Sequence, residues 1–173
     1  MKPFSGIILL SFVAAIAVSM SDAVFAENPL PKPSGPVSDF ANIITPPYEK
    51  RMGNVAKELL AKTGVALFVV TMPDLGGADA KEYAERLYDA WEVGKKEGDK
   101  GILILASIRE RKLQIRMGKG LEAILSQRRI GEIQDRFVAP YLKQNNYDDG
   151  LLNGVSAIAK IIAKESGVTL KEL

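Results

Sequence analysis

The sequence predicts a single α/β domain, a small three-layer sandwich with helices on both faces of a mixed sheet. Two apolar runs, 65–72 and 101–107, contain few polar residues, as expected of strands that are buried on both faces. The segment 79–91 between them repeats its apolar residues at helical spacing, so the two strands should be parallel and joined by a helical crossover. A third run, 112–117, alternates apolar and polar residues after a short turn, which predicts an antiparallel hairpin at the edge of the sheet.

The predicted hairpin determines what lies at each end of its two strands. If Ser107 faces Lys112, then Asp99 falls opposite Gly120. An acidic side chain and a glycine turn would then share one end of the sheet, and we expect function there. The outward charges of the alternating strand, such as Lys112 and Arg116, should also discourage pairing with a further strand.

A long helix is predicted before the first of these strands. Thr45 supplies a capping hydroxyl, Pro46 suits the first turn, and Gly64 ends the helix. Its apolar stripe comprises Tyr48, Met52, Val55, Ala56, Leu59 and Leu60. Before this helix, residues 37–39 are expected to form a short extended segment at the edge of the domain, and residues 40–44 to pack on its body.

Two more helices are predicted after the hairpin. The first covers residues 127–138 and is broken by Pro140. Its inward face comprises Ile130, Ile133 and Phe137. The second is capped by Asp148 or Asp149 and ends at Gly167.

The chain of 173 residues divides into four predicted segments. Residues 1–26 are predicted to be a signal peptide cleaved after Ala26, because a basic start precedes an apolar stretch and small residues at the cleavage positions. A membrane anchor is the alternative, but the apolar stretch is shorter than the ~20 residues that a spanning helix needs. Residues 27–36 form a proline-rich lead-in that is extended and poorly ordered, residues 37–166 the domain, and residues 167–173 a C-terminal tail. We therefore expect an exported protein, periplasmic or secreted, with no transmembrane anchor after cleavage.

The composition excludes several kinds of chemistry. The chain has no cysteine and no histidine, which excludes disulfides, Ser-His-Asp and Cys-His catalysis, and zinc or haem sites built from these residues. The net charge is +2, with 23 basic and 21 acidic residues interspersed, so no nucleic acid partner is expected. Carboxylates bind hard cations, so Ca²⁺ and Mg²⁺ are the metal ions that this chain can serve.

Short motifs follow one another through most of the predicted domain. They are Val37-x-Asp39-x-Ala41, the strand TGVALFVVT from Thr63, Tyr83-Ala84, Trp91-x-x-Gly94, Asp99-Lys100-Gly101-Ile102-Leu103, Gly118-x-Gly120-Leu121-Glu122, Pro140 and Tyr147-x-x-Gly150-Leu151. In this order they resemble the TPM domain family, which is named after a thylakoid lumen protein, a photosystem II repair protein and a receptor-associated membrane protein. No single motif is specific, but the ordered set is.

The resemblance implies a Rossmann-like α/β/α sandwich and an exported or lumenal protein. Some members of the family are assigned acid phosphatase activity, some bind calcium or magnesium in an acidic groove, and others resemble non-catalytic helpers of membrane-protein assembly or repair. This chain is expected to differ from many relatives in lacking a C-terminal membrane helix and a glycine-rich tail. It also has Gln127 where an aspartate is common, which removes one possible metal ligand.

Asp99 and Asp39 are the candidate metal ligands. Asp99 precedes the buried strand, and its alternative role is to accept hydrogen bonds from backbone N–H groups there. Asp39 is the second candidate if the N-terminal segment lies beside the base of the hairpin, and its alternative role is to cap the turn of residues 40–44. The two carboxylates would form a weak site for Ca²⁺ or Mg²⁺ that water completes.

The turn Gly118-Lys119-Gly120 is a candidate anion site, because its backbone N–H groups could face a phosphate. Its alternative role is a strand exit that needs a positive φ. The nearby cations Arg128, Arg129 and Arg136 either attract phosphate to the same groove or are solvated helix charges.

The position of Asp99 is unusual for a ligand site in such a sheet. Ligands of open α/β sheets usually bind at the carboxyl ends of the parallel strands, where this chain offers Asp74 and Ser107. We expect an exported binding or assembly module for envelope or membrane proteins, with a shallow cation site. The alternative is a metal-dependent acid phosphatase, in which Asp39 and Asp99 hold a metal-bound water and an arginine or lysine holds the phosphate. No catalytic residue is assigned.

Overall fold

The computed structural model describes residues 29–173, so the predicted signal peptide at residues 1–26 lies outside the described residues. In chain order the elements are β1 (Val37–Asp39), α1 (Pro46–Thr63), β2 (Ala66–Met72), α2 (Ala80–Ala90), η1 (Lys95–Glu97), β3 (Gly101–Ser107), β4 (Lys112–Met117), η2 (Lys119–Leu121), α3 (Gln127–Ile133), η3 (Gln134–Val138), α4 (Ala139–Leu142) and α5 (Tyr147–Glu165). Of these, η1 and η2 are 3-10 turns and η3 is a π-helical turn. Within the described part of the chain, no helix is both long and apolar enough to cross a membrane.

The sheet has four strands in the order β1-β2-β3-β4. β1 and β3 pair parallel with β2, and β4 pairs antiparallel with β3. Ser107 pairs with Lys112, and the Gly120 N–H donates to the Asp99 carbonyl oxygen at 3.1 Å. The predicted crossover, hairpin and register are therefore confirmed, and residues 37–39 form a true edge strand.

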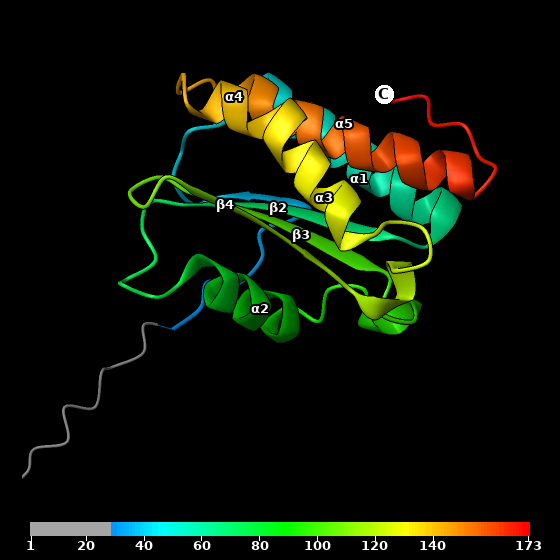
Figure 1. The fold of residues 1–173 in the computed structure, drawn as a ribbon, viewed down its shortest axis with the longest axis horizontal. Helices are drawn as coiled ribbons and strands as arrows, with labels where there is room; N and C mark the ends of the chain where they lie inside the picture. Colours follow the sequence, from blue (N-terminus) through cyan, green and yellow to red (C-terminus); the bar gives the residue numbers. More distant parts are fainter. Residues whose placement is uncertain (1–28) are drawn as a thin grey trace, which may run out of the picture.

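Helices cover both faces of this sheet, so the molecule has three layers (Figure 1). α1, α3, α4 and α5 lie on one face, and α2 lies on the other. Side chains of β3 alternate between the two cores: Ile102 and Ile104 pack in the larger one, and Leu103 and Leu105 in the smaller one. All seven residues of β3 are buried, as its uninterrupted apolar sequence predicts. The three-layer α/β sandwich with a mixed sheet is confirmed.

The caps of α1 and α5 differ from the prediction. The Thr45 side chain makes no capping bond to α1, because its hydroxyl instead donates to Asp148 Oδ2 at 2.7 Å. The cap of α5 is Asn146, whose Oδ1 accepts from the Asp149 N–H at 3.3 Å, and neither predicted aspartate has this role. Leu60, predicted to face inward from α1, is 42% exposed.

Pro140 does not break the helix that begins at Gln127. The chain passes from α3 through the π-turn η3 into α4, and Pro140 lies in the first turn of α4, where its missing N–H is not needed. The Ala139 N–H donates to the Gln134 carbonyl, five residues back, which is the π-helical pattern. Phe137, predicted to face the core, is 43% exposed.

Both ends of the described chain pack on the domain. The proline-rich lead-in, predicted to be poorly ordered, contacts the α2 side through two residues: Leu30 packs there, and Trp91 Nε1 donates to the Pro31 carbonyl at 2.7 Å. At the other end, Leu170 is buried, and the Lys171 N–H donates to Glu58 of α1 at 2.8 Å. The C-terminal tail is therefore part of the α1–α5 layer.

Candidate functional site

The two predicted metal ligands lie at opposite ends of the sheet. Asp39 pairs with Thr71, near the carboxyl end of β2. Asp99 precedes Gly101, which pairs with Ala66 at the amino end of β2. Because a strand rises about 3.3 Å per residue, the two aspartates are separated by about 20 Å along the sheet. One cation cannot contact both, so the site that Asp39 and Asp99 were predicted to share does not form.

Asp99 is held by its own turn. It adopts a positive φ of 58°, a conformation that aspartate tolerates better than most residues. The Tyr88 hydroxyl donates to Asp99 Oδ1 at 2.8 Å, and the Lys119 N–H donates to Asp99 Oδ2 at 2.8 Å. Both carboxylate oxygens therefore connect this turn to α2 and to the exit of β4.

The charges around Asp99 are positive. Burial disfavours the charged carboxylate, but the Lys119 N–H, the Tyr88 hydroxyl and the Arg116 guanidinium outweigh it, so the pKa of Asp99 is lowered. Burial, followed by the hydrogen bond to Asp99, raises the pKa of Tyr88. The Arg116 guanidinium lies 4.8 Å from the centre of the Tyr88 ring. Asp99 is thus an ionised acceptor that is already matched by cationic and hydrogen-bond donors.

The turn Gly118-Lys119-Gly120 directs its N–H groups inward. The Gly118 N–H donates to the Gly101 carbonyl at 2.9 Å, and the N–H groups of Lys119 and Gly120 donate to Asp99. None of the three is free for a phosphate, so the geometry gives no support to the predicted anion site. Gly118 has a φ of −74°, so a positive φ does not explain this glycine either. It is needed because a side chain would collide with Asp99 and Tyr88.

Asp39 caps the turn that follows β1. Its Oδ2 accepts from the N–H groups of Ile43 and Ile44 at 2.9 and 2.8 Å, and its Oδ1 accepts from the Thr71 hydroxyl. The capping role considered for Asp39 is therefore present. Its carboxylate also lies at the carboxyl end of the parallel strands, where ligands of α/β sheets usually bind.

More carboxylates gather beside Asp39 at the start of α5. Asp148 Oδ1 accepts from the Thr45 N–H at 2.8 Å, one residue after the last Asp39 donor. Asp149 accepts from the Tyr48 hydroxyl and from Asn146 Nδ2, each at 2.8 Å. The hydrogen bond from Asn146, then that from Tyr48, lowers the pKa of Asp149. We call Asp39, Asp148 and Asp149 the carboxyl-end acids.

A cavity of about 180 Å³ lies at the same end of the sheet, beside Ser107. Its lining is Ser107, Arg111, Leu113, Ala139, Leu142, Lys143 and Tyr147. The Ser107 hydroxyl donates to Glu110 Oε2, which lowers the pKa of Glu110, and Glu110 Oε1 accepts from the Leu75 N–H at 3.2 Å. Among the described residues, neither Arg111 nor Lys143 makes a salt bridge. The cavity is therefore apolar within and basic at its edge.

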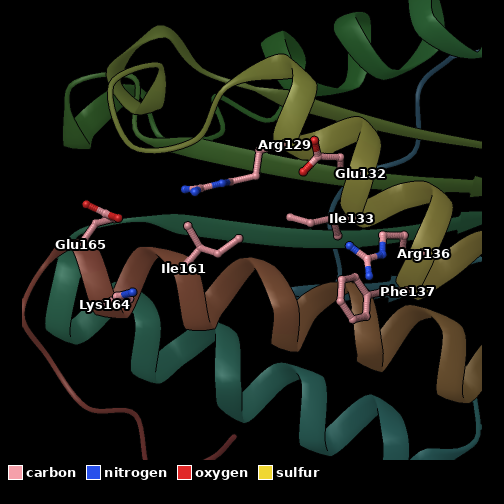
Figure 2. A pocket seen from close by; sticks show the side chains of 8 residues that line it. All are labelled: Arg129, Glu132, Ile133, Arg136, Phe137, Ile161, Lys164 and Glu165. Carbon is pink, nitrogen blue, oxygen red and sulfur yellow. The ribbon is translucent and has the colours of Figure 1, made fainter.

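Sequence reasoning assigned no role to Arg111 or Lys143. Ser107 ends a buried parallel strand, where ligands of α/β sheets usually bind, whereas the predicted ligand Asp99 precedes that strand. Arg111 follows Ser107 in the hairpin turn, whereas Lys143 directly follows α4, more than 30 residues later in the chain. Of the predicted phosphate-attracting arginines, Arg129 and Arg136 line a separate groove between α3, η3 and α5 (Figure 2).

The described residues do not form a dedicated metal cage. Ca²⁺ takes six to eight oxygen ligands, whereas no three acidic side chains within residues 29–173 converge closely enough to hold a metal ion. The carboxyl-end acids offer oxygen ligands, and the groups that donate hydrogen bonds to them are neutral. Each acid is, however, already hydrogen-bonded within the protein. This donor set fits only a cation that keeps most of its water ligands.

The chain is an α/β protein with a four-stranded mixed sheet between two helical layers. The TPM domain family profile matches residues 37–161, so the chain belongs to the TPM domain family. The comparison with curated proteins finds no match.

Solved structures that share this fold include three proteins. The N-terminal domain of a P. gingivalis protein is 25% identical, with a TM-score of 0.72 over 77% of this chain and 85% of that one. The N-terminal domain of the cg2496 protein of Corynebacterium glutamicum is 14% identical, with a TM-score of 0.59 over 77% and 83% of the two chains. The BA42 protein of Bizionia argentinensis is 18% identical, with a TM-score of 0.57 over 70% and 82%.

Proposed function

We propose that this TPM-domain protein works by binding and not by catalysis, with its ligand site at the carboxyl end of the sheet. The observation that supports this most directly is that the polar groups at this end already have partners within the protein. The carboxyl-end acids accept hydrogen bonds from backbone N–H groups, hydroxyls or an amide, and the Ser107 hydroxyl donates to Glu110. The lowered pKa of Glu110 and of Asp149 agrees with carboxylates that accept hydrogen bonds.

We place the proposed cation site at the carboxyl-end acids and not at Asp99. Asp99 faces Arg116 and Lys119, whose charges repel a cation, whereas the hydrogen bonds of Asp39, Asp148 and Asp149 come from neutral groups. Because no three acidic side chains of residues 29–173 converge, we propose that Ca²⁺ or Mg²⁺ contacts only one or two of these carboxylates at a time. The ion would then bind weakly and remain largely hydrated, with a dissociation constant of about 0.1–1 mM or higher.

We further propose that the protein acts outside the cytoplasm, in the periplasm or after secretion, on membrane-protein complexes of the envelope. The leader-like residues 1–26 support export. The chain has no cysteine and no histidine for nucleophilic or zinc chemistry, which favours a function in binding. A direct test of export is the N-terminal sequence of the protein recovered from the producing cells, which should begin at Glu27.

A second candidate function, a phosphatase, is favoured by one specific feature. The cations Arg111 and Lys143 stand at a cavity beside Ser107, and the carboxyl-end acids lie at the same end of the sheet. A phosphate held by the two cations would meet a hydrated metal ion on the acids. Asp39 could serve this chemistry, but Asp99 could not, because it lies at the other end.

Hydrolysis of para-nitrophenyl phosphate distinguishes the two functions. The protein should be assayed at acidic and neutral pH with Ca²⁺ or Mg²⁺ and with EDTA, beside the variant Lys143→Ala and a heat-denatured sample. We expect no turnover above the denatured sample under any condition. Turnover that is lost with EDTA and in Lys143→Ala would replace the binding function with the phosphatase.

A further inference from the structure

A groove on the outer surface of the helical layer is not used by the site described above. It has a volume of about 250 Å³ and lies between α3–η3 and α5. Figure 2 shows side chains of α3 and η3 on one side of it and those of α5 on the other. Its lining is Arg129, Glu132, Ile133, Arg136, Phe137, Ile161, Lys164 and Glu165.

The π-turn η3 brings an aromatic ring to the edge of this groove. In a regular helix Phe137 would lie near the direction of Ile130 and Ile133, because seven residues make almost two full turns. Ile130 and Ile133 are buried, but the wider turn of η3 leaves Phe137 43% exposed and gives the buried position to Val138. A π-turn is a rare feature that is frequent at functional sites, and here it exposes an apolar ring.

The charges of the groove are unbalanced. Arg129, Arg136 and Lys164 make no salt bridge among the described residues. One of the two acidic side chains in the lining, Glu132, already pairs with Arg128 at 3.4 Å. Free cations thus surround an apolar centre formed by Ile133, Phe137 and Ile161. The groove therefore complements an acidic ligand with an apolar side chain.

We propose that this groove docks a short acidic segment of a partner protein. One apolar side chain of the segment enters the hollow against Phe137 and Ile161, and flanking carboxylates pair with Arg129, Arg136 and Lys164. This inference rests on the proposed binding function and specifies the surface and the chemistry of the partner. A membrane surface fits less well, because the hollow is concave and suits a single inserted side chain.

The test uses a short fluorescein-labelled peptide in which two central leucines are flanked by aspartates, and a counterpart with lysines in place of the aspartates. Fluorescence polarisation should detect binding of the acidic peptide only, and its affinity should fall as salt rises. Phe137→Ala and Lys164→Glu should each weaken binding by about tenfold or more. Leu60→Ala and Lys57→Glu, matched in type and exposed on α1, should leave it unchanged.

The variants also report on the fold. Phe137 and Lys164 are exposed, so their substitution should leave the melting temperature almost unchanged, and a loss of affinity then reflects the groove. Equal binding of both peptides, or an equal response of the groove variants and their controls, would overturn the proposal. Binding to anionic phospholipid vesicles that Phe137→Ala abolishes, without binding of the acidic peptide, would assign the groove to a membrane instead. Self-association that Phe137→Ala abolishes, again without peptide binding, would assign it to a second copy of the chain.

The outcome is separable from that of the phosphoester assay. Peptide binding together with metal-dependent turnover would retain the groove and overturn the non-catalytic function. If neither peptide binding nor turnover is found, the groove proposal is overturned. The carboxyl-end site is then tested separately by titration with Ca²⁺ or Mg²⁺.

Discussion

Gly118→Ala is predicted to destabilise the domain strongly, although it adds only one methyl group. The added Cβ would lie within 3.0 Å of the Asp99 carbonyl oxygen, the Tyr88 hydroxyl and Asp99 Oδ1. Two of these atoms belong to the Asp99 turn, and the third is fixed by its hydrogen bond to that turn. The φ of Gly118 is −74°, which alanine adopts freely, so the whole effect must come from the collision.

The size of the effect follows from the bonds that relief of the collision would break. Opening the turn separates Asp99 from the Tyr88 hydroxyl at 2.8 Å, the Lys119 N–H at 2.8 Å and the Gly120 N–H at 3.1 Å. A net contribution of about 1 kcal/mol for each bond gives a loss of about 3 kcal/mol in the free energy of unfolding. For a domain of this size, that corresponds to a melting temperature lower by about 10 °C.

Urea unfolding followed by circular dichroism measures this loss, with Gly53→Ala as the matched control. A Cβ at Gly53, inside α1, meets no atom within 4 Å, so alanine should raise the free energy of unfolding by about 0.5–1 kcal/mol. If Gly118→Ala is as stable as the wild type, the close packing of Asp99 against the exit of β4 is not a source of stability.

Three further predictions concern the polar groups at the two ends of the sheet. The folded pKa of Asp99 is lowered, so its contribution to stability is complete above the unfolded value near pH 4 and is lost as the pH falls through the folded value. Acid titration of Asp99→Asn should therefore show a shallower loss of stability below about pH 4 than the wild type, and an unchanged slope would contradict the assignment. The folded pKa of Tyr88 is raised, so its contribution to stability is complete below the unfolded value near pH 10 and is lost as the pH rises through the folded value. The free energy of unfolding of Tyr88→Phe should therefore fall less steeply with alkaline pH than that of the wild type. Thr71→Val removes the hydroxyl that serves Asp39 and the Ala41 N–H, and thermal melts should show a loss of about 1–3 kcal/mol, whereas a neutral result would mean that water replaces it.

The central part of the fold was predictable because local sequence determines it. The apolar run of β3, the alternation of β4 and the short turn between them specify a hairpin whose register is then fixed by the pairing of Ser107 with Lys112. The crossover through α2 follows from chain handedness and helical periodicity, and Asp79 caps that helix by accepting from the Lys81 N–H at 2.9 Å.

The candidate site was less predictable because its parts meet only through long-range packing. A three-residue strand such as β1 carries no periodicity that indicates its neighbour. Its parallel pairing with β2 places Asp39 opposite Thr71, at the end of the sheet away from Asp99. Asp148 reaches Thr45 across more than 100 residues of sequence. The sequence does not indicate the π-turn, because the spacing of Ile130, Ile133 and Phe137 fits a regular helix. The extra residue of the wider turn does not alter that spacing.

A titration of Ca²⁺ or Mg²⁺ followed by amide NMR tests most directly the claim that ligands bind at the carboxyl end of the sheet. We predict saturable, weak shifts at Ile43, Ile44 and Asp148, and none at Lys119, which reports on Asp99. The variant Asp148→Asn should reduce the shifts, because it removes the negative charge. Its amide oxygen can still accept the hydrogen bond from the Thr45 N–H. Shifts centred on Lys119 and abolished by Asp99→Asn would contradict the account, because they would locate the cation at the opposite end of the sheet.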